Sequence, residues 1–145
     1  MPPEEPSLTP SSEKLILVVD DDQGMVEYLE MIVKKEGFRV ETAKDGQEAM
    51  DKAQQCAPDL ILLDLKLPKV QGLEMLRLLQ AGDAARVPVI VITGHLGNRE
   101  TESLIKQESN VRGYYTKPVN AVVLTMNIHS LLKTKPILSR QPADW

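Results

Sequence analysis

Residues 60–72 read LILLDLKLPKVQG, and this stretch decides the fold. Four consecutive aliphatic residues stop abruptly at Asp64, which is the pattern of a strand buried on both faces in a parallel sheet. In open parallel sheets, ligands bind at the edge formed by the carboxyl ends of the strands. Asp64 is therefore expected at a binding edge. Pro68 fixes φ in the loop that follows, and Gly72 allows a loop conformation that other residues avoid.

Aliphatic runs on both sides of this stretch alternate with amphipathic segments. Strands are expected at 14–19, 39–43, 60–63, 87–93 and 113–116, and helices at 23–36, 47–56, 73–81, 99–107 and 120–133. The helix at 99–107 is expected to be weakly amphipathic, because only Leu104 and Ile105 are strongly apolar. Five strands alternating with five helices predict an α/β domain with a parallel sheet, right-handed crossovers and helices on both faces.

Length, charge and composition bound the class of protein. The chain has 145 residues, enough for one compact domain at 14–133, with a proline-rich disordered tail at 1–13 and a second tail or linker start at 134–145. The net charge of −4 argues against direct nucleic-acid binding. The lone Cys56 cannot form an internal disulfide, and no apolar run approaches 18 residues. We therefore expect a soluble, cytoplasmic protein without membrane insertion, and no signal peptide is recognised at its start.

Polar residues follow four of the five predicted strands. The first strand ends at Asp20 and Asp21, the third at Asp64, the fourth at Thr93 and the fifth at Lys117. Because parallel strands end at the same edge of a sheet, these side chains are expected to meet there. The second strand supplies nothing comparable, so it should lie at an edge of the sheet away from the site.

Three carboxylates packed together repel one another. At about 4 Å and an effective dielectric constant near 20, each pair costs on the order of 4 kcal/mol. A divalent cation relieves this repulsion, and oxygen ligands suit Mg²⁺ or Mn²⁺ and not zinc. An aspartate beside bound Mg²⁺ can attack a phosphoryl group, while a lysine and a hydroxyl group bind the phosphoryl oxygens. The residue set therefore indicates a site that accepts a phosphoryl group.

Four motifs, each following a strand, together resemble those of the receiver domains of two-component response regulators. They are VVDDD at 18–22, DLKLP and then Gly72 at 64–72, VITG at 91–94, and YYTKP at 114–118. The resemblance spans residues 14–133 and implies the flavodoxin-like receiver fold, with strand order 2-1-3-4-5. It also implies a signalling domain that is not an enzyme in the usual sense but assists its own aspartyl phosphorylation and dephosphorylation.

The resemblance assigns the chemistry to particular residues. It implies that Asp64 is the phosphoacceptor. It implies that Asp20 and Asp21 bind Mg²⁺ together with Asp64 and the backbone carbonyl group of Lys66. The phosphoryl donor would be a phosphohistidine on a sensor histidine kinase or a histidine phosphotransfer protein.

Other residues would bind the phosphoryl group or report its presence. Thr93 and Lys117 would bind it, and Tyr114 occupies the position of the aromatic switch that turns inward when the threonine moves. Lys66 and His95, two residues beyond the phosphoacceptor and the threonine, would flank the path of hydrolytic water. Because a long cation at Lys66 can shield the acyl phosphate, we hypothesise a long-lived phosphorylated form.

The signal is expected to leave through the surface formed by residues 99–107, 113–116 and 120–133. The last helix carries apolar residues on more than one face, so this surface would bind an unidentified downstream protein or a second copy in a homodimer. His129 in that helix is interpreted as a surface residue.

Three functions remain open on the sequence alone. The first is a receiver, either stand-alone or part of a longer regulator. The second is a Mg²⁺-dependent phosphatase with an aspartate nucleophile, although such enzymes usually carry a second acid where this chain has Lys66. The third is a scaffold that works without phosphorylation, although the presence of all five site residues argues against it.

Overall fold

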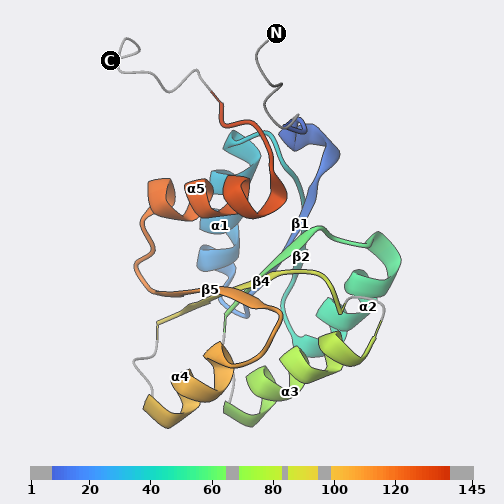
Figure 1. The fold of residues 1–145 in the computed structure, drawn as a ribbon, viewed down its shortest axis with the longest axis vertical. Coiled ribbons are helices and arrows are strands. Elements are labelled where there is room, and N and C mark those ends of the chain that lie inside the picture. The colour runs from blue at the N-terminus through green and yellow to red at the C-terminus, as the bar shows by residue number, and fades with distance from the viewer. Residues whose placement is uncertain (1–7, 65–68, 83–84, 95–98, 138–145) are drawn as a thin grey trace, which may run out of the picture.

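The computed structural model describes residues 8–64, 69–82, 85–94 and 99–137. Five parallel strands form one sheet in the order β2-β1-β3-β4-β5 (Figure 1), which confirms the predicted flavodoxin-like receiver fold. The strands are β1 (Leu15–Val19), β2 (Arg39–Ala43), β3 (Leu60–Leu63), β4 (Val89–Thr93) and β5 (Val111–Thr116). The helices are α1 (Gln23–Lys35), α2 (Gly46–Cys56), α3 (Lys69–Ala81), α4 (Arg99–Lys106) and α5 (Ala121–Leu132). Among the described helices, none is long and apolar enough to cross a membrane.

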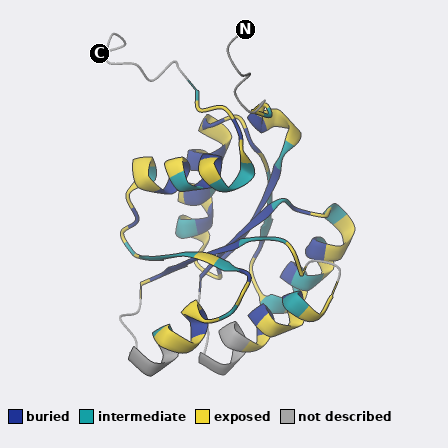
Figure 2. Ribbon diagram, viewed as in Figure 1, coloured by how far each residue is buried: buried dark blue, intermediate teal, exposed yellow. Residues whose placement is uncertain are grey.

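The sheet is buried between two helical layers, and successive strand residues enter opposite cores. On β1, Ile16 and Val18 pack in the core that includes α1 and α5, whereas Leu17 and Val19 pack in the core that includes α2, α3 and α4. Figure 2 shows the central strands buried and the outer helix faces exposed. Burial on both faces explains why these strands read as continuous apolar runs. The strand β2 lies at an edge of the sheet, as predicted.

Capping residues set several helix ends. The carboxylate of Asp22 accepts a hydrogen bond from the Gly24 N–H at 3.0 Å and caps α1. The side chain of Asn120 accepts from the first turn of α5 at 2.9 and 3.1 Å. Gly37, with φ of 91°, takes the left-handed conformation just beyond α1. Asp22 and Asn120 therefore cap the starts of α1 and α5, and Gly37 marks the end of α1.

Three element starts differ from the prediction by two residues or more. Strand β4 begins at Val89, two residues later than predicted. Helix α3 begins at Lys69, four residues before the predicted Leu73. Gly72 therefore lies inside the helix, and its predicted role in a loop was wrong; Pro68 lies outside the described residues. Strand β5 begins at Val111, two residues earlier than predicted.

Helix α4 separates its apolar and polar residues strongly, so the prediction that it is weakly amphipathic was wrong. Ile105 is buried in the core beside β5, while Lys106 on the next position is exposed. A helix this short needs only one well-placed apolar side chain to define its buried face, so counting apolar residues underestimated the effect.

The chain segments around the predicted domain limits are paired with each other. Thr9 and Thr134 form a parallel bridge, in which the Thr9 N–H donates to the Lys133 carbonyl at 2.9 Å and the Lys135 N–H donates to the Thr9 carbonyl at 3.1 Å. Ser11–Glu13 forms a short 3₁₀ helix. The predicted disordered tail is therefore wrong for residues 8–13, and the folded unit continues past residue 133. Residues 1–7 and 138–145 lie outside the described residues.

His129 is buried, contrary to its interpretation as a surface residue. Its Nε2 lies 2.8 Å from Glu36 Oε1, and its Nδ1 lies 2.7 Å from Thr134 Oγ1. The Phe38 ring lies beside the imidazole, with centroids 5.1 Å apart. The position was missed because the segment after α5 folds back and covers a helix face that the helix pattern alone leaves open to solvent.

Candidate functional site

The polar residues predicted from the strand ends do meet at one edge of the sheet. Asp20 directly follows β1 and Asp64 directly follows β3, and these two strands pair with each other. The backbone fixes both positions, because the Asp20 N–H donates to the Ala43 carbonyl at 3.1 Å and the Asp64 N–H donates to the Val19 carbonyl at 2.9 Å. Both carboxylate side chains are almost fully buried. The fold therefore holds two acids side by side with little access to water.

Lys117 bridges these two acids. Its Nζ donates to Asp64 Oδ2 at 2.9 Å and to Asp20 Oδ2 at 3.1 Å. Its backbone N–H donates to the Thr93 carbonyl at 2.9 Å, which fixes the lysine relative to β4. A Cβ atom at Gly94 would lie 3.4 Å from Lys117 Cδ, so the glycine leaves room for the lysine side chain. Gly94 belongs to the sequence motif VITG, but the motif alone does not show that a small residue there leaves space for the side chain of Lys117.

The acidic cluster offers a set of oxygen ligands. Asp20, Asp21 and Asp64 each present a carboxylate oxygen, and these atoms lie within 4.8 Å of one another. The Asp22 N–H donates to Asp20 Oδ1 at 2.9 Å and orients that carboxylate. Among the residues that the structure describes, Lys117 is the cation that contacts this cluster, and it pairs with Asp20 and Asp64, so one positive charge stands against three carboxylates there. Hard oxygen donors with this charge suit Mg²⁺ or Mn²⁺, and the residues therefore fit the metal that the sequence predicts.

The protonation of the site follows from burial and from these contacts. Burial raises the pKa of Asp64 from 3.8 to about 6, the Lys117 hydrogen bond opposes the rise, and the charge of Asp20 adds to it. Burial alone would lower the pKa of Lys117, but its hydrogen bonds to Asp64 and Asp20 raise it overall. A pKa of about 6 leaves Asp64 mostly ionised at pH 7, while making it a more basic carboxylate than a free aspartate. Such a group can act as a nucleophile.

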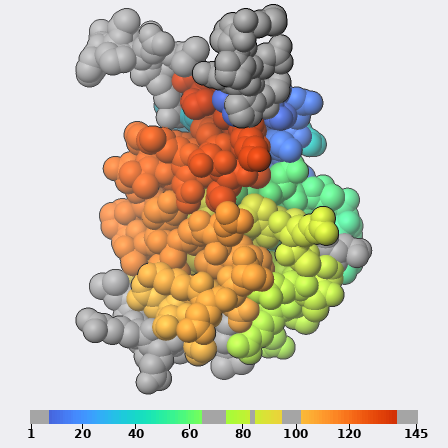
Figure 3. Space-filling view, viewed as in Figure 1, coloured from blue at the N-terminus to red at the C-terminus, as the bar shows by residue number. Residues whose placement is uncertain are grey.

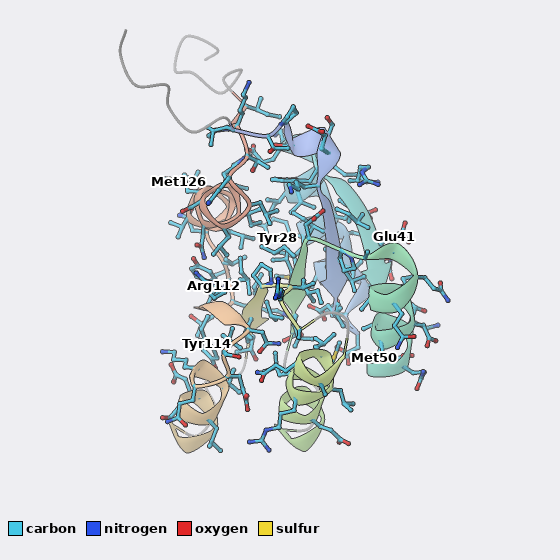
Figure 4. The ribbon with its side chains drawn as sticks, turned by 45° about the vertical axis from the view of Figure 1, so that its right-hand side comes forward. Tyr28, Glu41, Met50, Arg112, Tyr114 and Met126 are labelled. Atoms are coloured by element: carbon cyan, nitrogen blue, oxygen red, sulfur yellow. The ribbon has the colours of Figure 1, made fainter. Side chains whose placement is uncertain are left out.

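Thr93 and Tyr114 lie on the two strands beyond β3. Thr93 is buried at the carboxyl end of β4, at the same edge as the acids. Tyr114 lies on β5, half-buried beside α4 (Figure 4), with the Lys106 ammonium 5.2 Å from its ring centroid. Lys106 also pairs with Glu102 at 2.8 Å. The two other predicted site residues, Lys66 and His95, lie outside the described residues.

The predicted signalling surface is exposed and partly apolar. We name α4, β5 and α5 together the α4–β5–α5 face, and Figure 3 shows these elements as a continuous part of the molecular surface. The exposed apolar side chains on its helices are Leu104, Val122, Val123 and Met126. Met126 is 67% exposed and Val122 is 58% exposed. The exposure confirms the prediction that the last helix carries apolar residues beyond those that pack on the sheet.

Comparison with known proteins agrees with this geometry. The family model for the response regulator receiver domain matches residues 16–129. A CheY-like receiver domain protein from Methanospirillum hungatei JF-1 has a TM-score of 0.74 and 30% sequence identity, over 82% of this chain and 93% of that chain. The signal receiver domain of a response regulator from Bermanella marisrubri has a TM-score of 0.72 and 33% identity, over 81% of this chain and 96% of that chain.

Curated relatives carry a similar region within longer proteins. The alkaline phosphatase synthesis transcriptional regulatory protein PhoP of Bacillus subtilis is 33% identical over 124 residues, which cover 86% of this chain and 50% of PhoP. The transcriptional regulatory protein TrcR of Mycobacterium tuberculosis is 34% identical over 129 residues, which cover 89% of this chain and 49% of TrcR. The chain thus spans about half the length of these relatives. With its sheet order, its family match and its strand-end acids, this chain belongs to the response regulator receiver domains, the signalling domains of two-component systems.

Proposed function

We propose that the chain accepts a phosphoryl group from a phosphohistidine onto Asp64 in a Mg²⁺-dependent reaction. The observation that carries this proposal is the buried Asp64, 2.9 Å from the Lys117 ammonium and clustered with Asp20 and Asp21. An Asp64 carboxylate oxygen attacks phosphorus, the phosphorus–nitrogen bond of the donor breaks, and the imidazole leaves and takes up a proton. The donor would be a sensor histidine kinase or a histidine phosphotransfer protein.

The residues around Asp64 would have different roles in the reaction. Asp20 and Asp21 would hold Mg²⁺ or Mn²⁺ with Asp64 and the backbone carbonyl group of Lys66. When bound, the metal supplies positive charge against the carboxylates and the phosphoryl oxygens. Lys117 Nζ already lies at the acceptor oxygen and can bind a second phosphoryl oxygen as charge develops. The Thr93 hydroxyl group, at the end of the next strand, would bind a third.

These groups make the domain a phosphoacceptor that assists its own chemistry and not an enzyme that turns over a separate substrate. The same groups can position water for hydrolysis of the acyl phosphate, which would end the signal. Lys66 and His95 would flank the path of that water, and we keep the hypothesis of a long-lived phosphorylated form. The half-life of the aspartyl phosphate in the parent and in Lys66→Asn tests it, and an unchanged half-life would rule out shielding by Lys66.

Phosphorylation would be reported at the α4–β5–α5 face. Movement of Thr93 toward the phosphoryl group would let Tyr114 turn inward, and Tyr114 contacts α4 through Lys106. To move an equilibrium from 1:99 to 99:1, phosphorylation must favour the active state by about 5.5 kcal/mol. The exposed apolar side chains of α5 would then bind a downstream protein or a second copy of the chain. The net charge of −4 gives this domain no electrostatic basis for direct nucleic-acid binding.

Phosphoryl labelling tests the proposal directly. The protein is incubated with acetyl phosphate and Mg²⁺, and intact mass spectrometry follows the addition of one phosphoryl group. We expect one group on the parent and none on Asp64→Asn. Asp22→Asn is the matched control, because Asp22 is an exposed neighbour that caps α1 and is not one of the three clustered acids. No added mass, or labelling that survives in Asp64→Asn, would overturn the proposal.

A further inference from the structure

A groove between α2 and α3 is not used by the chemistry proposed above. Its described lining consists of Asp45, Gly46, Gln47, Met50, Glu74, Met75 and Leu78, around a volume of about 400 Å³. We name it the α2–α3 groove. Its volume is in the range of pockets that hold a ligand or a few side chains of a partner.

The groove has an apolar floor. Met75 is buried, Met50 is half-buried, and Leu78 on α3 is 50% exposed. Figure 4 shows Met50 on the side of α2 that faces α3. A single exposed leucine is ordinary on a protein surface, but here it borders a concave site beside two methionines. Methionine side chains are flexible and polarisable, so they adapt to an inserted apolar side chain.

The rim of the groove is acidic. Asp45 and Glu74 are both exposed, and the described lining contains no lysine, arginine or histidine. Asp45 is held in place, because its carboxylate accepts from the Glu48 N–H at 2.8 Å and caps α2. An apolar floor between two acids is complementary to an apolar side chain flanked by cations, and it disfavours an anionic ligand.

The groove also lies near the phosphoacceptor. Asp45 follows β2 by two residues, and the last residue of β2, Ala43, accepts a hydrogen bond from the Asp20 N–H at 3.1 Å. Helix α3 is the first element after Asp64. A partner seated in the groove would therefore sit beside the acidic edge of the sheet, on elements separate from α4, β5 and α5.

We propose that the α2–α3 groove binds a segment of a partner protein in which leucine or a similar apolar residue is flanked by lysine or arginine. Recognition combines burial of the apolar side chain against Met50, Met75 and Leu78 with attraction of the flanking cations to Asp45 and Glu74. The contact area is small, so binding of an isolated peptide is expected to be weak and fast. The binding does not require phosphorylation of Asp64, so it can be measured on the unphosphorylated protein and succeeds or fails independently of the phosphoacceptor chemistry.

Methyl NMR with ¹³C-labelled methionine reports on the groove directly. The probe is the synthetic peptide acetyl-KKLLKK-amide, and the comparison peptides are acetyl-KKSSKK-amide and acetyl-EELLEE-amide. We expect the first peptide to shift the Met50 and Met75 methyl signals saturably, and the other two to leave them nearly unchanged. Met31 on α1 and Met126 on α5, both exposed, serve as internal controls that should not shift.

Charge reversal completes the test. Glu74→Lys should weaken the binding of acetyl-KKLLKK-amide by about fivefold or more, because a like charge then faces the flanking cations. Glu27→Lys is the matched control on the exposed surface of α1, and it should leave the affinity unchanged. Leu78→Ser removes part of the apolar floor and should weaken binding without a change of charge. Unchanged affinity in Glu74→Lys, equal binding of acetyl-KKSSKK-amide, or shifts centred on Met126 would each overturn the proposal.

Discussion

Asp64 is held by groups that shift its pKa in opposite directions. Burial and the Asp20 carboxylate raise the pKa, and the Lys117 hydrogen bond limits the rise to about 6. Between pH 3.8 and about 6, the folded state therefore holds a proton on Asp64 that the unfolded chain has lost. The unfolded state then binds fewer protons, so the contribution of Asp64 to stability falls as the pH rises through this window.

Substitution of Asp64 by asparagine should reveal how much the ionisation of Asp64 lowers the stability of the domain. Asparagine has the shape of a neutral aspartic acid, so Asp64→Asn removes the titration. Without divalent cations, we expect Asp64→Asn to be more stable than the parent at pH 7 by up to about 3 kcal/mol, since one pKa unit corresponds to about 1.4 kcal/mol. The difference should shrink toward pH 4. Urea unfolding of both proteins from pH 4 to pH 7 measures it, and a difference that does not change with pH would contradict the assignment.

Gly94 should matter for the space it leaves and not for its backbone freedom. Alanine would make an ordinary contact with Lys117 Cδ at 3.4 Å, whereas leucine would have to displace the lysine side chain from Asp64. Because small misplacements of a reacting group cost rate steeply, Gly94→Leu should slow labelling by acetyl phosphate by roughly 100-fold. Gly94→Ala should be close to the parent. Thermal unfolding checks that both variants fold, and equal losses in the two would show that space beside Lys117 is not the cause.

At the scale of elements, the least expected feature is the attachment of α5 to the end of α1. His129 on α5, Glu36 at the end of α1 and Thr134 beyond α5 form one buried set of hydrogen bonds. Thr134 is itself paired with Thr9 through the backbone. The network therefore fixes α5 against α1 and against both peripheral segments, on the face of the sheet opposite α2, α3 and α4.

Removal of one member of this network should destabilise the whole domain. Thr134→Val keeps the side-chain shape but leaves a buried imidazole nitrogen without its hydroxyl partner, and we expect a loss of about 1–3 kcal/mol in the free energy of unfolding. Thr116→Val, at an exposed threonine on β5, is the control and should change stability by less than about 0.5 kcal/mol. Urea titration monitored by circular dichroism gives both values. If the two valine variants lost the same amount, the buried hydrogen bond would not be the stabilising contact.

The elements that the sequence predicted best are those with the strongest pattern. The runs LILVV, LILL and VIVIT form β1, β3 and β4. A strand buried on both faces is apolar at nearly every position, so it is easy to recognise in the sequence. The start of α3 was missed because Pro68 and Gly72 suggested a longer loop, while the helix tolerates a glycine in its first turns. The burial of His129 depends on Glu36, 93 residues earlier in the chain, and no local pattern reports such a pairing.

The composition of the site was predictable for a different reason. Asp20, Asp64 and Lys117 each follow a strand. A parallel sheet places the carboxyl ends of its strands at one edge, and this does not depend on the conformation of the loops. Spacing alone could not give the distances, the burial of two of the acids or the room left by Gly94, because these depend on side chains from separate strands. The α2–α3 groove could not be predicted either. The sequence of each helix indicates an amphipathic helix, but it does not indicate the space between the two helices.

At the scale of the whole molecule, metal binding should increase the thermal stability of the domain. A ligand that binds only the folded state stabilises it by about 2.7 kcal/mol at 100 times its Kd. We therefore expect Mg²⁺ to raise the melting temperature of the parent. Asp21→Asn should abolish most of this increase while leaving the metal-free melting temperature nearly unchanged, because Asp21 is exposed and Asp20 and Asp64 are buried. Na⁺ at matched ionic strength is the control, and an equal response to Na⁺ would indicate general screening and no specific site.

The bridge between Thr9 and Thr134 has a mechanical consequence. The two segments run parallel, so a pull on the chain before residue 9 and a pull after residue 134 act in opposite directions along the same line. Such a load shears the two backbone hydrogen bonds at once and does not peel them apart one by one. A force applied to these two segments is carried first by the bridge. The sheet and its acidic edge come under load only after the bridge has broken, so the bridge protects the core from mechanical force.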